Sequence, residues 1–275
     1  MFAGLSCKDF NNPEQIPAYI YVAPFQKETT ASQGSESHQV TEAWIYADLN
    51  FLGVYEPGRT YPVLSEGMTN FRIFGGIREN AIDELIAIYP MYDSIVINKE
   101  LKAGRTDTIY PVLRYNSKAT FKFVEDFESN HIFTYDVDNN TNTRLEVSSE
   151  FAKDGVRSGK MEVNKDNPVN DIGTTFIFED LPAGGQALFL EFDYYIEVPL
   201  FVGLEMYNPN EAVQKYFKLQ LLPRSGWNKV YVRFNEEVQG FRKKGYRFIF
   251  STEYDPEKEG QPQRAFIDNV KLIHL

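Results

Sequence analysis

The stretch "FLEFDYYIE" at residues 189–197 carries closely spaced carboxyl groups. On a strand, two-residue alternation places one set of side chains together, namely Phe189, Glu191, Asp193, Tyr195 and Glu197. Glycoside hydrolysis uses two carboxyl groups about 5 to 10 Å apart, and neighbours on one strand face are spaced roughly 7 Å. The same pattern is typical of the solvated face of any antiparallel strand. The spacing therefore permits a glycosidase and favours a surface strand.

Other catalytic constellations are missing from the sequence. The three histidines, His38, His131 and His274, lie far apart, and none belongs to a recognisable triad motif. Zinc needs several Cys or His ligands at close spacing, which the chain does not offer. No glycine-rich stretch has the strand before and the helix after that a phosphate loop requires. We expect no enzymatic activity.

Asp268 presents a different problem, in the stretch "AFIDNVKLI". Strict alternation places Asp268 on one strand face with Phe266, Val270 and Leu272. A carboxylate among core residues is too unfavourable unless it is neutralised. A hard cation, a salt bridge to a nearby Lys or Arg, or a bulge that turns Asp268 outward would each resolve the conflict.

The composition describes an ordinary globular protein. The 275 residues are 43% hydrophobic and include 28 basic and 39 acidic side chains, a formal net charge of -11. This charge repels phosphates, so we expect no nucleic-acid partner. No apolar run approaches the roughly 20 residues that span a bilayer. The 22 Phe and 17 Tyr favour β structure.

Short aromatic and β-branched runs, separated by Gly, Pro or Asn, predict an all-β chain of two sandwiches. We predict a signal remnant and tether at residues 1–15, an immunoglobulin-like β-sandwich at 16–118, and a jelly-roll β-sandwich at 119–275. Runs such as "VTEAWIYAD" and "SIVIN" belong to the first sandwich, and runs such as "LFVGLEMY" and "YRFIFSTEY" to the second.

Cys7, the only cysteine, follows the short residues "MFAGLS" and precedes a polar stretch. This arrangement resembles the end of a bacterial lipoprotein signal whose upstream part is missing. Leu5 stands two residues before the cysteine, where the usual motif has its leucine three before. The resemblance implies a lipid on Cys7 that anchors the protein to a membrane. The alternative is a reduced cysteine in a frayed terminus.

The C-terminal half carries a second resemblance. An opening "DFE", a middle "SGK", a Trp-led "GWNKVYVRF" and a terminal "FIDNVKL" are similar, in order and spacing, to galactose-binding-like jelly rolls, which include many carbohydrate-binding modules. This resemblance covers residues 121–275. Together with Cys7 and the preceding sandwich, the whole chain resembles two-domain outer-membrane lipoproteins of the Bacteroidetes, which implies an outer-membrane location.

In the jelly-roll family, a structural calcium commonly sits where the first and last strands meet. The resemblance implies Glu128 and Asp268 as acidic ligands, with carbonyl oxygens from the loop around Ser158, Gly159 and Lys160. Lys160 is close enough in this arrangement to be a salt-bridge partner of Asp268 instead.

The strand faces opposite the predicted core of the second sandwich are unusually aromatic. We expect four rings to share an exposed ligand-binding surface, namely Tyr195, Tyr207, Trp227 and Tyr231. Sugars stack their C–H faces on flat rings, and protein interfaces use similar residues. The alternative is that some of these rings are buried between the sheets.

These observations favour a non-catalytic, lipid-anchored envelope protein that binds a glycan or an envelope protein through its jelly roll. A structural accessory subunit of an outer-membrane complex is the alternative, and a glycoside hydrolase is a distant third.

Overall fold

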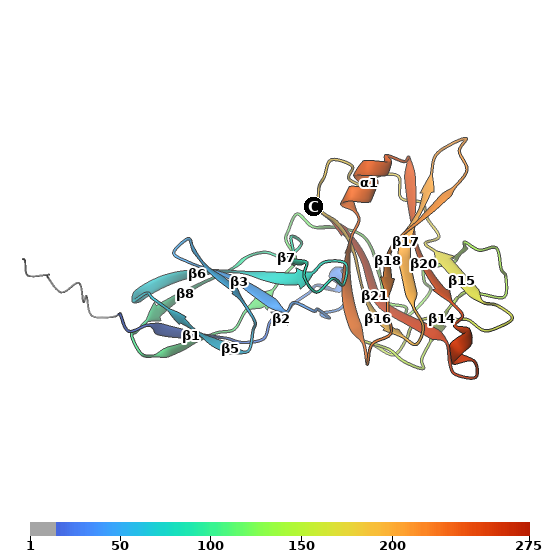
Figure 1. Ribbon diagram of the computed structural model, residues 1–275. Coiled ribbons are helices and arrows are strands. Elements are labelled where there is room, and N and C mark those ends of the chain that lie inside the picture. The colour runs from blue at the N-terminus through green and yellow to red at the C-terminus, as the bar shows by residue number, and fades with distance from the viewer. Residues whose placement is uncertain (1–14) are drawn as a thin grey trace, which may run out of the picture.

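The computed structural model describes residues 15–275, and this part of the chain is built almost wholly of β-strands. The predicted fold class is confirmed, because two β-sandwiches follow one another along the chain (Figure 1). A single α-helix, α1 (Asn235–Phe241), and two short 3-10 turns, η1 (Ala31–Gln33) and η2 (Pro256–Lys258), are the helical elements of the described residues.

The N-terminal sandwich has two main sheets and a short parallel pair of strands. One sheet has the order β5-β1-β9, and the other has the order β4-β3-β6-β7 with β8 also paired to β6. The third unit is the pair β10-β2. The strands are β1 (Ala18–Val22), β2 (Gln26–Lys27), β3 (Glu42–Ala47), β4 (Asn50–Tyr55), β5 (Arg59–Val63), β6 (Gly67–Arg78), β7 (Ile86–Ile88), β8 (Ile95–Leu101), β9 (Thr106–Ile109) and β10 (Val112–Leu113).

In the C-terminal sandwich, two larger sheets face each other. One has the order β13-β14-β21-β16-β19 with β11 also paired to β21, and the other has the order β12-β15-β20-β17-β18. The strands are β11 (Thr120–Glu125), β12 (Tyr135–Asp136), β13 (Leu145–Ser148), β14 (Ser158–Glu162), β15 (Val169–Gly173), β16 (Leu188–Ile196), β17 (Leu200–Tyr207), β18 (Gln214–Leu221), β19 (Asn228–Arg233), β20 (Gly245–Glu253) and β21 (Arg264–His274).

Two-residue alternation identifies the core face of the central strands correctly. The core between the two C-terminal sheets contains the residues predicted to face inward from β16, β17 and β19. They are Leu190, Phe192, Tyr194 and Ile196, then Leu200, Val202, Leu204 and Met206, then Val230 and Val232. Alternation works here because each strand buries one side chain in two against the facing sheet.

Strict alternation fails on β21, where the prediction for Asp268 is wrong. The pairing of β16 with β21 shifts register between Glu191 and Asp193, and Asn269 opposite this point has a φ of 51°. The resulting bulge leaves Val270 and Leu272 in the core, together with Ile267, and turns Asp268 to the other face. The outward-turning bulge is therefore the alternative that the structure adopts.

The N-terminal sandwich packs against the outer face of the β16–β21 sheet, as the close approach of β7 to that sheet shows in Figure 1. Its hydrophobic core extends across the junction to Phe189, Tyr231 and Ile273. At the sheet edge, Glu79 forms a β-bridge with Tyr231, and the backbone N–H of Asn80 donates to the Tyr231 carbonyl at 2.9 Å. The junction thus covers both a face and an edge of the jelly roll.

Candidate binding surface

A cluster of charged side chains is buried where the two sandwiches meet. Glu191, on the outer face of β16, has no exposed surface. Its carboxylate accepts hydrogen bonds from the hydroxyls of Tyr89, at 3.0 Å, and Tyr115. Lys271 Nζ lies 3.7 Å from Glu191 Oε1, and Lys27 Nζ donates to the Tyr115 hydroxyl at 3.0 Å. Residues from both sandwiches therefore share one hydrogen-bonded network.

The titration of this cluster reflects burial and the surplus of cations. Burial by itself would raise the pKa of Glu191, but the positive charges of three nearby lysines outweigh it and lower the pKa to about 2. These lysines are Lys229, Lys27 and Lys271. Burial lowers the pKa of Lys27 to about 6 and the pKa of Lys271 to about 8. Burial thus disfavours the charged form of Lys27 and Lys271, and the negative charge of Glu191 partly offsets this effect.

The carboxyl pair that permits a glycosidase is closed to a substrate. Asp193 is 1% exposed and accepts from the Ser37 hydroxyl at 2.7 Å and from the Asn269 amide at 3.0 Å. Lys229 Nζ lies 3.5 Å from Asp193 Oδ2. Because Glu191 and Asp193 are both covered by the N-terminal sandwich and paired to cations, these two groups hold the domains together.

The four rings predicted to share an exposed surface do not do so. Tyr231 is 1% exposed, since the N-terminal sandwich covers it, and its hydroxyl accepts from the Gln39 backbone N–H at 3.0 Å. Tyr195 and Trp227 are half-buried neighbours, with ring centroids 6.2 Å apart. Tyr207 belongs to the other sheet, on β17. The prediction of one shared surface is wrong because Tyr231 is buried and Tyr207 lies on the other sheet.

The outer face of the β12-β15-β20-β17-β18 sheet, hereafter the β17–β20 face, lies on the side of the jelly roll away from the N-terminal sandwich (Figure 1). Its outward side chains combine aromatic rings with charges. They are Tyr135, Asp171, Phe201, Glu205, Tyr207, Lys215, Phe217 and Arg247. Tyr135 and Phe217 are 39% and 38% exposed. This face thus presents two partly accessible rings beside charged side chains.

Arg247 organises the centre of the β17–β20 face. Its Nε donates to the Thr174 carbonyl at 2.7 Å, and its guanidinium forms an ion pair with Glu205. The guanidinium carbon lies 3.4 Å from the centroid of the Tyr135 ring. Gly173 makes room for this side chain, because a Cβ there would lie 2.6 Å from Arg247 Cδ. Tyr135 is therefore held in a fixed position on the surface.

A salt bridge between two long-separated strands crosses the β17–β20 face. Lys215 on β18 and Asp171 on β15 are separated by two strands, which corresponds to about 14 Å across a flat sheet. Lys215 Nζ nevertheless lies 2.9 Å from Asp171 Oδ2. Ile249 and Ser251, which point outward from β20 between them, are only 1% and 3% exposed, as expected where longer side chains cross above them.

Sequence reasoning missed most of this surface. Alternation along "QKYFKLQL" and "YRFIFSTE" provides a signal for Phe217 and Arg247, since both stand opposite core positions. Tyr135 lies in a strand of two residues, too short for any periodic signal. Gly173 is recognised only from the side chain that lies over it.

The residues implied for calcium are held by amide donors. Glu128 Oε1 accepts from the backbone N–H groups of Val156 and Arg157 at 2.8 and 2.9 Å. Asp268 accepts from the backbone N–H groups of Lys153, Asp154 and Asn269 at 2.9, 3.3 and 2.8 Å. The intervening loop therefore directs N–H groups, not the expected carbonyl oxygens, toward both carboxylates.

This donor set does not fit a hard cation, which needs free oxygen ligands. Within residues 15–275, no group of three or more His, Cys, Asp or Glu side chains has a geometry that can hold a metal ion. Burial raises the pKa of Asp268 to about 7, against the opposing effect of its amide donors. Calcium binding at Glu128 and Asp268 stays an untested prediction.

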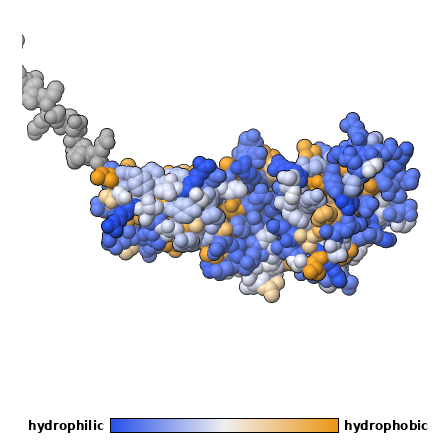
Figure 2. All heavy atoms as spheres, turned by 90° about the horizontal axis from the view of Figure 1, so that it is seen from below, coloured by the Kyte–Doolittle hydropathy of each residue, from blue (hydrophilic) through white to orange (hydrophobic). Residues whose placement is uncertain are grey.

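The predicted lipid attachment site, Cys7, lies outside the residues that the structure describes. No helix in residues 15–275 is long and apolar enough to cross a membrane. Hydrophilic side chains dominate the molecular face shown in Figure 2, with scattered hydrophobic ones between them.

Comparisons with known proteins find similarity only among solved structures. No protein-family model matches the chain, and no curated protein matches it in sequence. A family 11 carbohydrate-binding module of a Clostridium thermocellum cellulosomal cellulase has a TM-score of 0.41 at 13% identity, covering 58% of this chain and 97% of that chain. A family 22 xylan-binding domain from Paenibacillus barcinonensis has a TM-score of 0.40 at 12% identity, covering 57% of this chain and 95% of that chain. Similarity at this level does not transfer a ligand.

Proposed function

We propose that this chain is a non-catalytic glycan-binding protein of the cell envelope, which binds its ligand on the β17–β20 face. The observation that carries the proposal is the outer sheet face on which exposed Tyr135 and Phe217 flank a fixed Glu205–Arg247 pair. The N-terminal sandwich covers part of the other outer sheet face, around Phe189, Tyr231 and Ile273.

The chemistry of this face suits a sugar chain. Aromatic rings stack on the C–H faces of pyranose rings, and charged side chains exchange hydrogen bonds with hydroxyl groups. Phe201 supports Phe217 from the side, with ring centroids 5.9 Å apart. Because Arg247 fixes Tyr135, little conformational entropy is lost when a ligand stacks on the ring.

Replacing Tyr135 or Phe217 by alanine is expected to weaken glycan binding about tenfold each, which is roughly 1.4 kcal/mol per lost ring. The probes are cellohexaose, xylohexaose and mannohexaose, titrated by isothermal calorimetry. Calorimetric unfolding of each variant verifies that the domain still folds, since both rings are partly exposed.

Tyr110→Ala is the matched control, because Tyr110 is a 71% exposed ring on the N-terminal sandwich. It is expected to bind like the wild type. Binding of none of the three probes, or unchanged binding by both ring variants, would contradict a glycan site on this face.

A second candidate function, an accessory subunit of an outer-membrane complex, is favoured by a different surface. The outer face of the β4-β3-β6 sheet bears a group of neighbouring aromatic rings. The ring centroid of Phe51 lies 5.8 Å from that of Trp44 and 5.1 Å from that of Tyr46. Phe51 is 51% exposed. Exposed aromatic patches of this kind are typical of protein interfaces. Stoichiometric co-purification of an envelope protein, lost in Phe51→Ser, would support this role over the glycan-binding one.

The envelope location in the proposal rests on the lipoprotein-like sequence around Cys7. When the chain is expressed behind a complete lipoprotein signal, the protein is expected to partition into the outer membrane through a lipid on Cys7. Cys7→Ala is expected to move nearly all of it to the soluble fraction. Fractionation followed by immunoblotting measures this, and an unchanged membrane fraction in Cys7→Ala would rule out lipid anchoring at this residue.

A further inference from the structure

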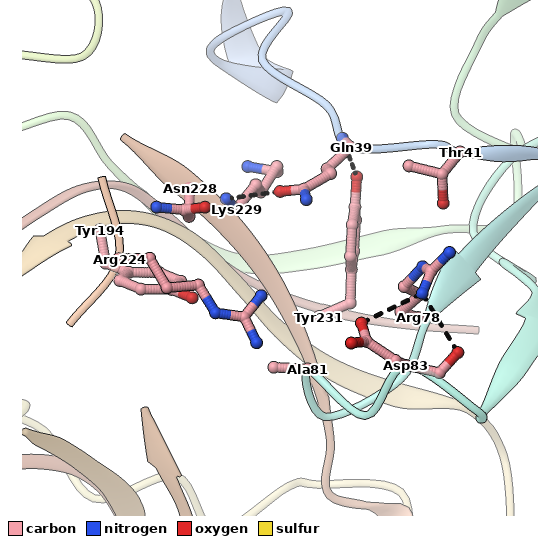
Figure 3. Close-up of a pocket in the computed structure, with 10 residues that line it drawn as sticks. All are labelled: Gln39, Thr41, Arg78, Ala81, Asp83, Tyr194, Arg224, Asn228, Lys229 and Tyr231. Carbon is pink, nitrogen blue, oxygen red and sulfur yellow. Dashed lines mark hydrogen bonds and ion pairs between the residues drawn. The ribbon is translucent and has the colours of Figure 1, made fainter. Parts of the chain in front are cut away.

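A small polar pocket lies where the two sandwiches meet beside β19, and its volume is about 260 Å³. We refer to it as the junction pocket. Figure 3 shows side chains from both sandwiches around it. The N-terminal sandwich and the segment before β3 contribute Gln39, Thr41, Arg78, Ala81 and Asp83, and the jelly roll contributes Tyr194, Arg224, Asn228, Lys229 and Tyr231.

The walls of the junction pocket are held by hydrogen bonds across the junction. The Gln39 side-chain oxygen accepts from the Lys229 backbone N–H at 2.9 Å, while the Gln39 backbone N–H donates to the Tyr231 hydroxyl at 3.0 Å. With its oxygen occupied, the Gln39 amide group keeps its NH₂ available as a donor. Arg78 is fixed between Glu42 and Asp83, at 3.1 Å from each. The site is therefore largely preformed.

Arg224 is the distinctive cation of the pocket. Figure 3 shows its side chain extending toward Tyr231 and Arg78 across the opening. In the part of the chain from residue 15 to 275, no ion pair involves Arg224, whereas Arg78 and Lys229 each have acidic partners. Arg224 is an exposed residue of the pocket lining, and its planar guanidinium can bind a carboxylate through two parallel hydrogen bonds.

Tyr194 provides a second polar group at the same place. Only 2% of this residue is exposed, and the residue lines the pocket. Burial raises the pKa of its hydroxyl, and the nearby positive charge of Arg224 opposes that rise. The Tyr194 hydroxyl is a neutral hydrogen-bond donor, and the Arg224 guanidinium is a charged one. Together they can bind an anionic ligand that also carries hydroxyl groups.

The volume of the junction pocket and its other polar groups restrict the kind of ligand that it can bind. Its volume lies below the roughly 300 to 1,000 Å³ typical of sites for drug-sized ligands, so it suits a single sugar ring. Asp83 and the Asn228 side-chain oxygen can accept from sugar hydroxyls, and Gln39 can donate to them. Arg78 and Lys229 are already paired to carboxylates, so within residues 15–275 Arg224 is the lining cation that remains to pair with an anionic ligand.

We infer that the junction pocket binds one acidic monosaccharide unit, a hexuronic acid, with its carboxylate paired to Arg224. This site belongs to the β16–β19 side of the jelly roll and does not rest on the glycan site proposed on the β17–β20 face. The sugar hydroxyls contact Asp83, Asn228 and Gln39, and Tyr194 donates to the carboxylate.

Titration of the full chain with glucuronic acid and galacturonic acid, and with glucose and galactose as neutral counterparts, tests the inference. By isothermal calorimetry, at least one acid is expected to bind at least tenfold more tightly than its neutral counterpart, because the charge-assisted pair is lost with the carboxylate. Arg224→Gln is expected to abolish this preference, and Arg224→Lys to retain part of it. Arg72→Gln, a change of another exposed arginine, is expected to bind like the wild type.

Equal affinity for acid and neutral sugar, absence of acid binding up to about 10 mM, or unchanged binding in Arg224→Gln would each overturn the inference. Tyr135→Ala separates the two sites. If Tyr135→Ala removes acid binding while Arg224→Gln does not, the acid binds the β17–β20 face, so the junction pocket is ruled out and the proposed function stands.

Discussion

Glu191→Gln is expected to lower the free energy of unfolding by about 3 to 5 kcal/mol, because it removes a fully buried negative charge that faces three buried lysines. Glutamine keeps the shape of the side chain, and it can still accept from Tyr89 or Tyr115. The charge is lost, however, and Lys271, which has no exposed surface, is left without its anion. Denaturation by urea at neutral pH, followed by fluorescence, measures the change.

The acid limb of the stability curve provides an independent measurement of the same group. The pKa of Glu191 is about 2 in the folded state, below the ordinary value of 4.5 that applies to the unfolded chain, so the ionised carboxylate stabilises the fold above pH 4.5. This contribution is lost as the pH falls from 4.5 to 2. The difference between wild type and Glu191→Gln is therefore expected to shrink in that window.

Glu100→Gln, at an exposed position of the N-terminal sandwich, is the matched control and is expected to change the free energy of unfolding by less than about 0.5 kcal/mol. An effect of Glu191→Gln as small as that of the control would mean that the buried lysines do not depend on this carboxylate.

Lys27→Met is expected to stabilise the protein, on the order of 3 kcal/mol near pH 6, because it removes a buried amine that folding holds in an unfavourable state. Burial lowers the pKa of Lys27 from 10.5 to about 6, more than the attraction of Glu191 can offset. Methionine keeps the apolar stem but gives up the hydrogen bonds to the Ser37 carbonyl and the Tyr115 hydroxyl. This loss is included in the expected magnitude.

The sign of the pH dependence follows from the same pKa. Between pH 6 and 10.5 the unfolded chain binds a proton at Lys27 that the folded chain releases, so the free energy of unfolding of the wild type rises with pH across this range. The advantage of Lys27→Met is therefore expected to be largest at and below pH 6 and to shrink toward pH 10.5. Lys102→Met, at an exposed position, is expected to leave the slope unchanged. A wild-type slope that Lys27→Met leaves intact would contradict this assignment.

The buried charge cluster also explains why the two sandwiches form one unit. Its members come from segments far apart in the chain, with Lys27 and Tyr115 on one side and Glu191 and Lys271 on the other. An ion pair can be replaced by apolar residues without loss of stability, but removing one partner leaves a buried charge. The cluster therefore favours one docking geometry over others in which these charges would be unpaired. That geometry also forms the junction pocket, since residues of both sandwiches line it.

The sequence by itself determines the all-β class and the inward face of the central strands. A strand in a sandwich buries every second side chain, so Leu190 and Phe192, or Val202 and Leu204, can be assigned to the core from local spacing alone. The same rule fails at Asp268, because a bulge at Asn269 adds one residue to the count. Local spacing does not report a bulge, since a bulge depends on the pairing with β16.

Only the tertiary structure decides which outward face stays open. From spacing alone, Glu191 and Tyr231 on one sheet are indistinguishable from Glu205 and Tyr207 on the other, because all four alternate with core residues. The first two are buried because the N-terminal sandwich packs on their sheet, and that contact is set by shape and charge between segments far apart in sequence. Alternation is a property of one strand, whereas solvent exposure of its outer face depends on what packs against the sheet.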